Sequence, residues 1–209
     1  MLAHVVGRVQ RAQRVDEVAV ATTDVPDDDA VVSECEQLGV RVFRGSEFDV
    51  LSRFAGAAAA FGAGTIVRIT SDCPLIDPEV IDEVVCALGS ADFAANTLER
   101  TYPQGLDVEV VSREALDRTA REAVEPYDRE HVFPYVYRHP ERFEFVSVTC
   151  EDDWSGLRWT VDEAADLEFV RAVHARLGDP SSWRDVLALV EREPELAEIN
   201  RGVQQKPAP

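Results

Sequence analysis

The chain has 209 residues, enough for one domain with a buried core. Its formal net charge of −19 at pH 7 argues against a nucleic-acid-binding surface, because phosphates would be repelled. No apolar run reaches the ~20 residues that a membrane-spanning helix needs, and the first residues do not resemble a signal peptide. We therefore expect a cytoplasmic protein that binds neither nucleic acid nor a membrane.

The four cysteines lie far apart in the sequence and show neither the spacing of a zinc site nor a disulfide framework. Reduced thiols are therefore expected. Cys73 lies in a polar turn at residues 70–76, but no neighbouring feature marks it as a nucleophile.

Strands and helices alternate in the first half of the chain. Residues 2–13 place apolar side chains at helical spacing, so the chain opens in an amphipathic helix. Short apolar runs then alternate with segments that begin at Asp and end at Gly, as helices do. The expected strands are 18–21, 40–43 and 65–69, and the expected helices are 27–38, 49–61 and 78–88. This rhythm predicts an α/β fold built from βαβ units, with a mostly parallel sheet, right-handed crossovers and helices on both faces.

The rhythm changes after residue 91. Residues 95–150 contain many aromatic residues and prolines, so we interpret them as an elaboration that contacts substrate and forms an oligomer interface. We predict a single domain at 1–200 and a frayed tail at 201–209. The expected strands are 92–95, 106–111, 143–149 and 159–161, and the expected helices are 113–123, 162–177 and 183–190, the last capped by Ser181 or Ser182.

Two aspartates follow runs whose carboxyl ends we expect at one edge of the sheet. Asp72 follows the run 65–69, in a turn before a helix start at Asp77, and Asp162 follows the run 159–161. Ligands bind at the carboxyl edge of open α/β sheets. A pair of carboxylates there suits Mg²⁺, which takes oxygen ligands and keeps waters and substrate phosphates. The ordinary alternative is a turn residue at Asp72 and a helix N-cap at Asp162.

Several cationic side chains could pair with an anionic substrate, or could equally be solvated or ion-paired surface residues. They are Arg68, Arg129, His131 and Arg158. Residues 102–107 form an expected turn into a strand, which is ordinary hairpin chemistry. The short loop 44–46 could expose backbone N–H groups to a ligand.

Six short motifs occur in an order that resembles one known family. They are Val20-Ala21-Thr22-Thr23, Val42-Phe43-Arg44-Gly45-Ser46, Asp72-Cys73-Pro74-Leu75-Ile76-Asp77, Gly105-Leu106-Asp107-Val108-Glu109-Val110, Arg129-Glu130-His131-Val132 and Leu157-Arg158-Trp159-Thr160-Val161-Asp162. Over residues 1–175, the chain resembles the cytidylyltransferase-like family of the spore coat polysaccharide biosynthesis protein F. That family is itself similar to acylneuraminate and 3-deoxy-manno-octulosonate cytidylyltransferases. The resemblance implies a Rossmann-like nucleotide-diphosphosugar-transferase (GT-A-like) fold.

The resemblance also implies a reaction and a set of site residues. By analogy, the protein transfers a cytidylyl group from CTP to a sugar acid or related acceptor for surface-polysaccharide synthesis, with Mg²⁺ as cofactor and pyrophosphate as leaving group. Asp72 and Asp162 match the two aspartates that hold magnesium in the sugar-acid cytidylyltransferases. The residues placed near the nucleotide are Thr22, Thr23, Arg44 and Ser46. Those placed around the acceptor are Arg68, Asp107, Arg129, His131 and Arg158. A homodimer through residues 95–150 is expected on the same grounds.

The start of the chain departs from the family pattern. Members begin with a strand and a phosphate-binding loop of the kind Arg-x-x-Ser-x-Arg-Leu-Pro-x-Lys, whereas Met1 falls where the helix after that loop begins. We therefore expect the usual first strand to be missing from the sheet, through a start site assigned too far downstream or a fragment. Two alternative functions stay open, the first from the same type of fold and the second from the missing loop. One is a glycosyltransferase that uses a nucleotide sugar, and the other is a non-catalytic homologue that acts as a binding partner.

Overall fold

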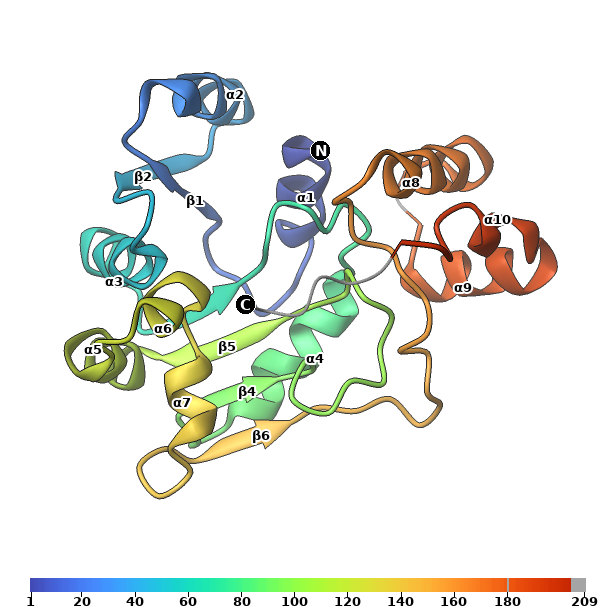
Figure 1. Cartoon of the computed structure of the whole chain (residues 1–209). Helices are drawn as coiled ribbons and strands as arrows, with labels where there is room; N and C mark the ends of the chain where they lie inside the picture. Colours follow the sequence, from blue (N-terminus) through green and yellow to red (C-terminus); the bar gives the residue numbers. More distant parts are fainter. Residues whose placement is uncertain (180, 204–209) are drawn as a thin grey trace.

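The computed structural model describes residues 1–179 and 181–203, and Figure 1 shows its mixture of strands and helices. The strands are β1 (Ala19–Thr23), β2 (Arg41–Gly45), β3 (Thr65–Arg68), β4 (Phe93–Ala95), β5 (Glu109–Ser112) and β6 (Phe145–Ser147). The helices are α1 (Leu2–Val9), the 3₁₀ helix η1 (Pro26–Asp28), α2 (Asp29–Leu38), α3 (Val50–Phe61), α4 (Pro78–Leu88), α5 (Arg113–Glu122), α6 (Pro126–His131), α7 (Pro134–Arg138), α8 (Ala164–Leu177), α9 (Trp183–Arg192) and α10 (Glu195–Glu198). The predicted α/β class is confirmed. Within these ranges, no helix is both long and apolar enough to span a membrane.

The strands form two sheets. β1 and β2 pair in parallel, with Thr22 beside Arg44 and Thr23 beside Gly45. The other strands lie in the order β3-β5-β4-β6. In this second sheet β4 and β6 are parallel, whereas β5 is antiparallel to both β3 and β4. The sheet is thus not mostly parallel, contrary to the prediction from the sequence. A loop without a crossover helix connects β4 to β5, and a connection of this kind joins antiparallel strands. No described strand joins β1 to β3.

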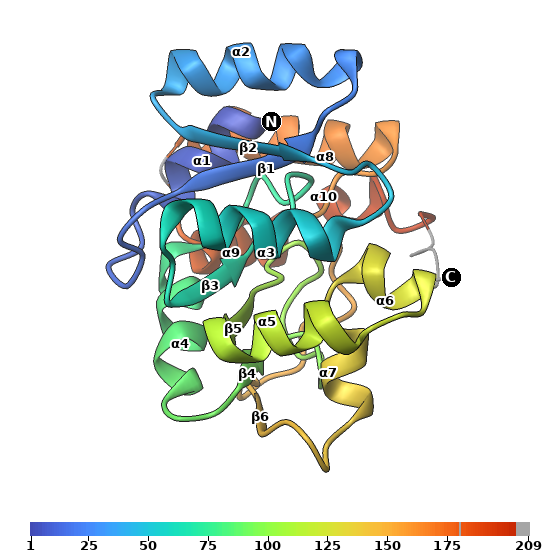
Figure 2. The same cartoon turned by 90° about the vertical axis from the view of Figure 1, so that its left-hand side faces the viewer.

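Helices cover both faces of the four-stranded sheet, as predicted (Figure 1). The side chains of β4 alternate between the two faces. Ala94 packs in a core that includes residues of α4, α8 and α9, whereas Phe93 and Ala95 pack with residues of α3, α5 and α7. Around the smaller β1–β2 sheet, α2 and α3 lie on opposite sides (Figure 2). Both sheets are therefore enclosed by helices, and the loops at the strand ends are left to form a site.

Capping residues set the helix boundaries beside these loops. Asp77 accepts a hydrogen bond from the Glu79 N–H at 2.8 Å, and Pro78 begins α4, as predicted. Asp49 caps α3 in the same way, and Gly62 ends that helix in the left-handed conformation at φ +69°. The loops after β2 and β3 therefore end at defined helix starts.

The predicted strand at residues 159–161 is wrong. There the backbone makes single hydrogen bonds to two irregular segments instead of joining a strand ladder. The Trp159 N–H donates to the Gln104 carbonyl at 2.7 Å, and the Val161 N–H donates to the Asp72 carbonyl at 2.9 Å. Residues 157–161, which we call the late segment, are therefore extended but lie between two loops.

Some predicted boundaries also shift. The helix predicted at 2–13 ends at Val9. After it, the N–H groups of Arg11 and Ala12 donate to the carbonyls three residues earlier, as in turns, and not four residues earlier, as in an α-helix. α8 begins at Ala164 with Glu163 as its N-cap, so Asp162 lies before the helix. Ser182, one of the two predicted caps, caps α9. Residues 204–209 of the predicted tail lie outside the described residues.

Gly105 allows the late segment to lie close to the loop before β5. Its φ is +100°, a conformation that side chains other than glycine rarely adopt. A Cβ at this position would lie 2.6 Å from the Thr160 nitrogen and 2.6 Å from the Trp159 carbonyl carbon. The close approach of the two segments thus requires a residue without a side chain.

Gly105→Ala should lower the free energy of unfolding by about 3 kcal/mol or more, because backbone strain and a backbone clash add together. Gly62→Ala is the matched control, since φ there is +69° but no atom lies within 4 Å of the added Cβ; it should cost about 1 kcal/mol. Urea unfolding followed by circular dichroism measures both values. Equal losses of unfolding free energy in the two variants would show that the late segment does not pack closely against Gly105.

Candidate functional site

Asp72 lies in the turn between β3 and α4, beside the late segment. Its Oδ2 accepts a hydrogen bond from the Thr160 hydroxyl at 3.1 Å, and its Oδ1 accepts one from the Cys73 thiol at 3.5 Å. No ion pair formed within the described ranges includes Asp72. Asp72 is therefore a partly exposed carboxylate that is held by neutral donors.

The Cys73 thiol beside it is not a nucleophile. Burial raises the pKa of Cys73 far above its usual range, and the negative charge of Asp72 adds to the effect. All four cysteines are free, as predicted.

The late segment brings Asp162 to Asp72. The hydrogen bond from the Val161 N–H to the Asp72 carbonyl, at 2.9 Å, places the residue before Asp162 directly against the turn. The Asp162 side chain is 43% exposed, and its Oδ2 accepts a hydrogen bond from Arg158 at 2.5 Å. The structure therefore places the backbone of Asp162 next to that of Asp72, although Asp162 follows an extended segment and not a strand.

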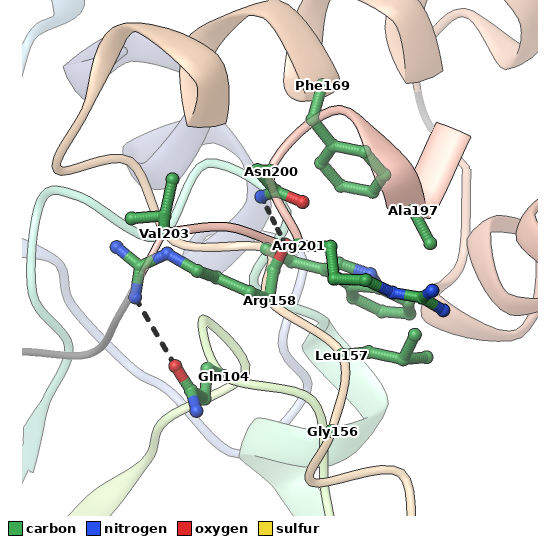
Figure 3. Close-up of a pocket in the computed structure, with 10 residues that line it drawn as sticks. Gln104, Gly156, Leu157, Arg158, Phe169, Ala197, Asn200, Arg201 and Val203 are labelled. Carbon is green, nitrogen blue, oxygen red and sulfur yellow. Dashed lines mark hydrogen bonds between the residues drawn. The ribbon is translucent and has the colours of Figure 1, made fainter. Parts of the chain in front are cut away.

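Arg158 lies beside Asp162, with a side chain that is 7% exposed. Its Nε and Nη2 donate to Asp166 at 2.9 and 3.0 Å. Its Nη1 donates to Gln104 Oε1 at 3.3 Å, the hydrogen bond drawn between these two residues in Figure 3. Burial alone would raise the pKa of Asp166, but hydrogen bonds from Arg158, Asn200 and two backbone N–H groups lower it to about 2. The hydrogen bond to Asp166 raises the pKa of Arg158 despite its burial. Both groups stay charged, and Arg158 holds the carboxylate of Asp162.

A pocket of about 140 Å³ opens beside Arg158 (Figure 3). One side is formed by Gln104 and residues 156–159, and the other by residues that follow α10, among them Asn200. The segment after α10 therefore forms one wall of the space next to Arg158.

The threonines expected near the nucleotide lie at the carboxyl end of β1 and converge on Asp28. Asp28 Oδ2 accepts hydrogen bonds from the Thr22 hydroxyl at 2.6 Å, the Thr23 hydroxyl at 2.5 Å and the Thr23 N–H at 2.8 Å. These hydrogen bonds lower the pKa of Asp28 to about 2. On β2, Arg44 donates to the carbonyls of Thr23 and Val25 at 2.9 and 2.8 Å. This loop is therefore shaped by internal hydrogen bonds.

Asp49 connects two other predicted residues. Its N–H donates to Ser46 Oγ at 3.1 Å, and its Oδ2 accepts a hydrogen bond from Arg129 Nε at 2.8 Å. Arg129 Nη2 forms an ion pair with the same oxygen at 2.7 Å. Arg129 also donates to the carbonyls of Ala120 and Ala123 at 3.1 and 2.9 Å. Arg129 thus ties the start of α3 to the end of α5.

Two further ion pairs lie where β3 ends and β5 begins. Arg68 pairs with Glu109 across the two strands. Asp107 accepts hydrogen bonds from both terminal nitrogens of Arg100 at 2.6 and 2.8 Å. Burial raises the pKa of Glu109, and the charge of Arg68 opposes that effect. The predicted residues Arg68 and Asp107 therefore each carry a partner of opposite charge.

His131 lies at the end of α6, with its ring centroid 4.6 Å from that of Tyr127. Its Nε2 is buried and has no hydrogen-bond partner among the described residues. The next residue, Val132, has φ +76°, which is rare for a β-branched residue. In the described part of the chain, no hydrogen bond or ion pair joins His131 to Asp72 or Asp162.

Three residues that sequence reasoning did not single out hold the aspartate pair: Thr160, Asp166 and Asn200. Thr160 lies within the motif at 157–162, and Asp166 forms a capping box with Glu163, so both had a local signal. Asn200 had none, because it follows a short helix and lies 34 positions from Asp166 in sequence.

The donor set limits the kind of metal that the site could hold. No group of three or more His, Cys, Asp or Glu side chains gathers within residues 1–179 and 181–203. A metal ion here would therefore rely on Asp72, Asp162 and ligands from outside the chain. Mg²⁺ fits this arrangement, because it is commonly bound through one or two carboxylates plus waters and substrate phosphates.

The lowered pKa of Asp28 predicts how stability depends on pH. Because this pKa falls from 3.8 to about 2 on folding, the carboxylate stabilises the fold above pH ~4, and its contribution is lost as the pH falls toward 2. Asp28→Asn should cost about 1 kcal/mol at pH 6, after allowance for solvent screening, and about half as much at pH 3. Urea unfolding at both pH values measures this, with the exposed neighbour Asp27→Asn as control. A cost that is the same at both pH values would contradict the assignment.

Comparison with known proteins places the chain among cytidylyltransferases. A family model described as cytidylyltransferase matches residues 1–172. The spore coat polysaccharide biosynthesis protein SpsF of Bacillus subtilis is 32% identical over 191 residues, which are 87% of this chain and 78% of that protein. A 3-deoxy-manno-octulosonate cytidylyltransferase of Anaeromyxobacter dehalogenans is 35% identical over 128 residues, which are 56% of this chain and 50% of that protein.

A solved structure agrees with these relatives. A cytidylyltransferase from Leptospira borgpetersenii superposes with a TM-score of 0.89 at 29% identity, covering 98% of this chain and 87% of that one. The predicted nucleotide-diphosphosugar-transferase type of fold is confirmed, and the chain belongs to the cytidylyltransferase family.

Proposed function

We propose that the protein transfers a cytidylyl group from CTP to a sugar acid, with Mg²⁺ bound by Asp72 and Asp162. The observation that carries the proposal is the backbone hydrogen bond from Val161 to the Asp72 carbonyl. It places Asp72, which has no ion-pair partner among the described residues, next to the solvent-exposed Asp162. Family membership supplies the nucleotidyl-transfer chemistry. The names of the two relatives support a sugar-acid acceptor and a role in surface-polysaccharide synthesis.

In the proposed reaction, an acceptor hydroxyl gives up its proton to solvent while its oxygen bonds to the α-phosphorus of CTP. The bond from this phosphorus to the bridging oxygen breaks, and pyrophosphate leaves. Such transfers depend mainly on positioning and on the stabilisation of charge. Mg²⁺, when bound, would neutralise charge on the phosphate oxygens. Asp72 and Asp162 supply the hard oxygen ligands that this ion prefers.

The nucleotide is assigned to the carboxyl ends of β1 and β2. The residues there already make internal hydrogen bonds, so we assign them to the shape of the nucleotide-binding loops. These residues are Thr22, Thr23, Arg44 and Ser46.

The acceptor is assigned to the space next to the aspartate pair. Arg68 and Asp107 lie at the strand ends there, and Arg158 orients Asp162. Arg129 and His131 are placed farther out, where they shape the helices that enclose the site.

The reaction can be tested by incubating the protein with CTP, Mg²⁺ and a panel of sugar acids while pyrophosphate release is measured. Release that requires all three components is expected. Transfer of a sugar from a nucleotide sugar, without pyrophosphate release from CTP, would identify a glycosyltransferase instead. A melting temperature that CTP with Mg²⁺ does not raise would indicate a non-catalytic binding partner, because a ligand of the folded state must stabilise it.

Asp72→Asn and Asp162→Asn should each lower kcat/KM on the order of a thousandfold, because loss of a metal ligand removes several kcal/mol of transition-state stabilisation. Asp152→Asn is the control, since this exposed carboxylate precedes the late segment and its loss changes the net charge equally. Pyrophosphate release under saturating Mg²⁺ gives the ratio. Activity in either site variant close to that of Asp152→Asn would rule out a shared role in metal binding.

We also propose a homodimer through residues 95–150. Two apolar side chains in this region are solvent-exposed, Val124 at 78% and Tyr137 at 37%. Light scattering coupled to gel filtration should give twice the 23.2 kDa mass of one chain. Val124→Asp should shift the measured mass toward the monomer, and a monomeric wild type would contradict the proposal.

A further inference from the structure

Asp166, in the first turn of α8, is the most densely hydrogen-bonded carboxylate beside the site. Its side chain is completely buried. The groups that donate to it are Arg158 Nε at 2.9 Å and Nη2 at 3.0 Å, the N–H groups of Asp162 at 3.1 Å and Glu163 at 3.0 Å, and Asn200 Nδ2 at 2.9 Å. Asp166 therefore contacts Asp162 in two ways: directly through the Asp162 N–H, and through the shared guanidinium of Arg158.

Asn200 reaches this carboxylate from a distant part of the chain. It follows α10, is 3% exposed, and lies beyond residues 1–172, which the family model matches. Its single carboxamide nitrogen donates to the Arg158 carbonyl at 2.9 Å (Figure 3). The same nitrogen donates to Asp166 Oδ1, also at 2.9 Å. One buried amide thus connects the C-terminal segment to the late segment and to Asp166.

We propose that Asn200 and Asp166 are positioning residues that set the affinity of Asp162 for a divalent cation. The proposal rests on the proposed function, in which Asp162 is a metal ligand. Neither residue touches the ion or the nucleotide. Both act through Arg158 and through the backbone of the late segment.

The charge on Arg158 explains the effect of Asp166. The guanidinium lies between two carboxylates, and its Nη2 donates to Asp162 at 2.5 Å and to Asp166 at 3.0 Å. Because Asp166 balances the guanidinium charge, Asp162 keeps enough negative charge to attract a cation. Without Asp166, Arg158 would neutralise Asp162 instead and would compete with the metal.

Asn200 holds the late segment in place relative to Asp166, because it donates hydrogen bonds to both. Loss of its amide would leave the buried Arg158 carbonyl without this donor and would remove one of the groups that fix Asp166. Since Asp162 is four residues after Arg158, a shift of the backbone at Arg158 would move its carboxylate relative to Asp72. Partners that orient metal ligands in this way typically change metal affinity by roughly 10–100-fold when mutated.

The test measures binding of Mn²⁺, used in place of Mg²⁺, to the full chain with CTP present, by electron paramagnetic resonance of the free ion, as the loss of signal relative to a protein-free sample with the same CTP concentration. Asn200→Leu removes the amide, and Asn200→Ser keeps one donor in the same region as a milder change. Val186→Ala is the control, because Val186 is buried in α9 and its truncation loosens the C-terminal helices without touching Asp166. Circular dichroism melting confirms that each variant is folded at the assay temperature.

We expect the half-saturating Mn²⁺ concentration to rise about tenfold in Asn200→Leu and less in Asn200→Ser, with the amount bound at saturation unchanged. Val186→Ala should lower the melting temperature but bind Mn²⁺ like the wild type. If Asn200→Leu also binds like the wild type, the positioning role is overturned while the proposed function stands. If the wild type binds no Mn²⁺ in the presence of CTP, the metal site of the proposed function fails, and this inference fails with it.

Discussion

The site depends on the backbone hydrogen bonds of the late segment. On one side, residues 157–159 bond to Gln104, and on the other, Val161 bonds to the carbonyl of Asp72. These bonds hold an irregular segment where a regular strand is absent, and Gly105 permits the approach because a side chain at that position would strike the segment. The nearness of the two aspartate backbones is therefore set by main-chain hydrogen bonds, which mutation of either carboxylate would leave in place.

The charges around Asp72 and Asp162 support the proposed binding of a divalent cation. The protein carries a net charge of −19 and has one lysine, Lys206, which lies outside the described residues. The arginines nearest the aspartate pair each have an acidic partner: Arg68 with Glu109, Arg100 with Asp107, and Arg158 with Asp166 and Asp162. A triphosphate approaching these groups would meet little free positive charge from them. A divalent cation at Asp72 and Asp162 would supply that charge, which is why the metal is central to the proposed function.

Local signals in the sequence predicted the features that depend on neighbouring residues. The caps at Asp77 and Asp49, the glycine that ends α3, and the turn that carries Asp72 all follow from short-range hydrogen bonding. The sequence places Asp162 near Asp72 on the expectation of a strand at 159–161, whereas in the structure an irregular segment brings them near, through the hydrogen bond from the Val161 N–H to the Asp72 carbonyl.

Long-range contacts account for what could not be predicted. The antiparallel direction of β5 depends on the path of a loop, and the late segment resembles a strand in composition but finds no partner strand. The ion pair between Arg129 and Asp49, which lie 80 positions apart, could not be predicted from the pattern around either residue. No sequence pattern marks Asn200, because its contacts with Asp166 and Arg158 depend only on where α10 ends in the fold.

The most direct measurement is a crystal structure of the protein soaked with CTP and Mn²⁺, with the metal located by its anomalous scattering. One metal position is expected within about 2.1–2.3 Å of a carboxylate oxygen from Asp72 and one from Asp162, and in contact with the phosphates of CTP. A metal bound to CTP but contacting neither aspartate, or a nucleotide bound away from the late segment, would contradict it.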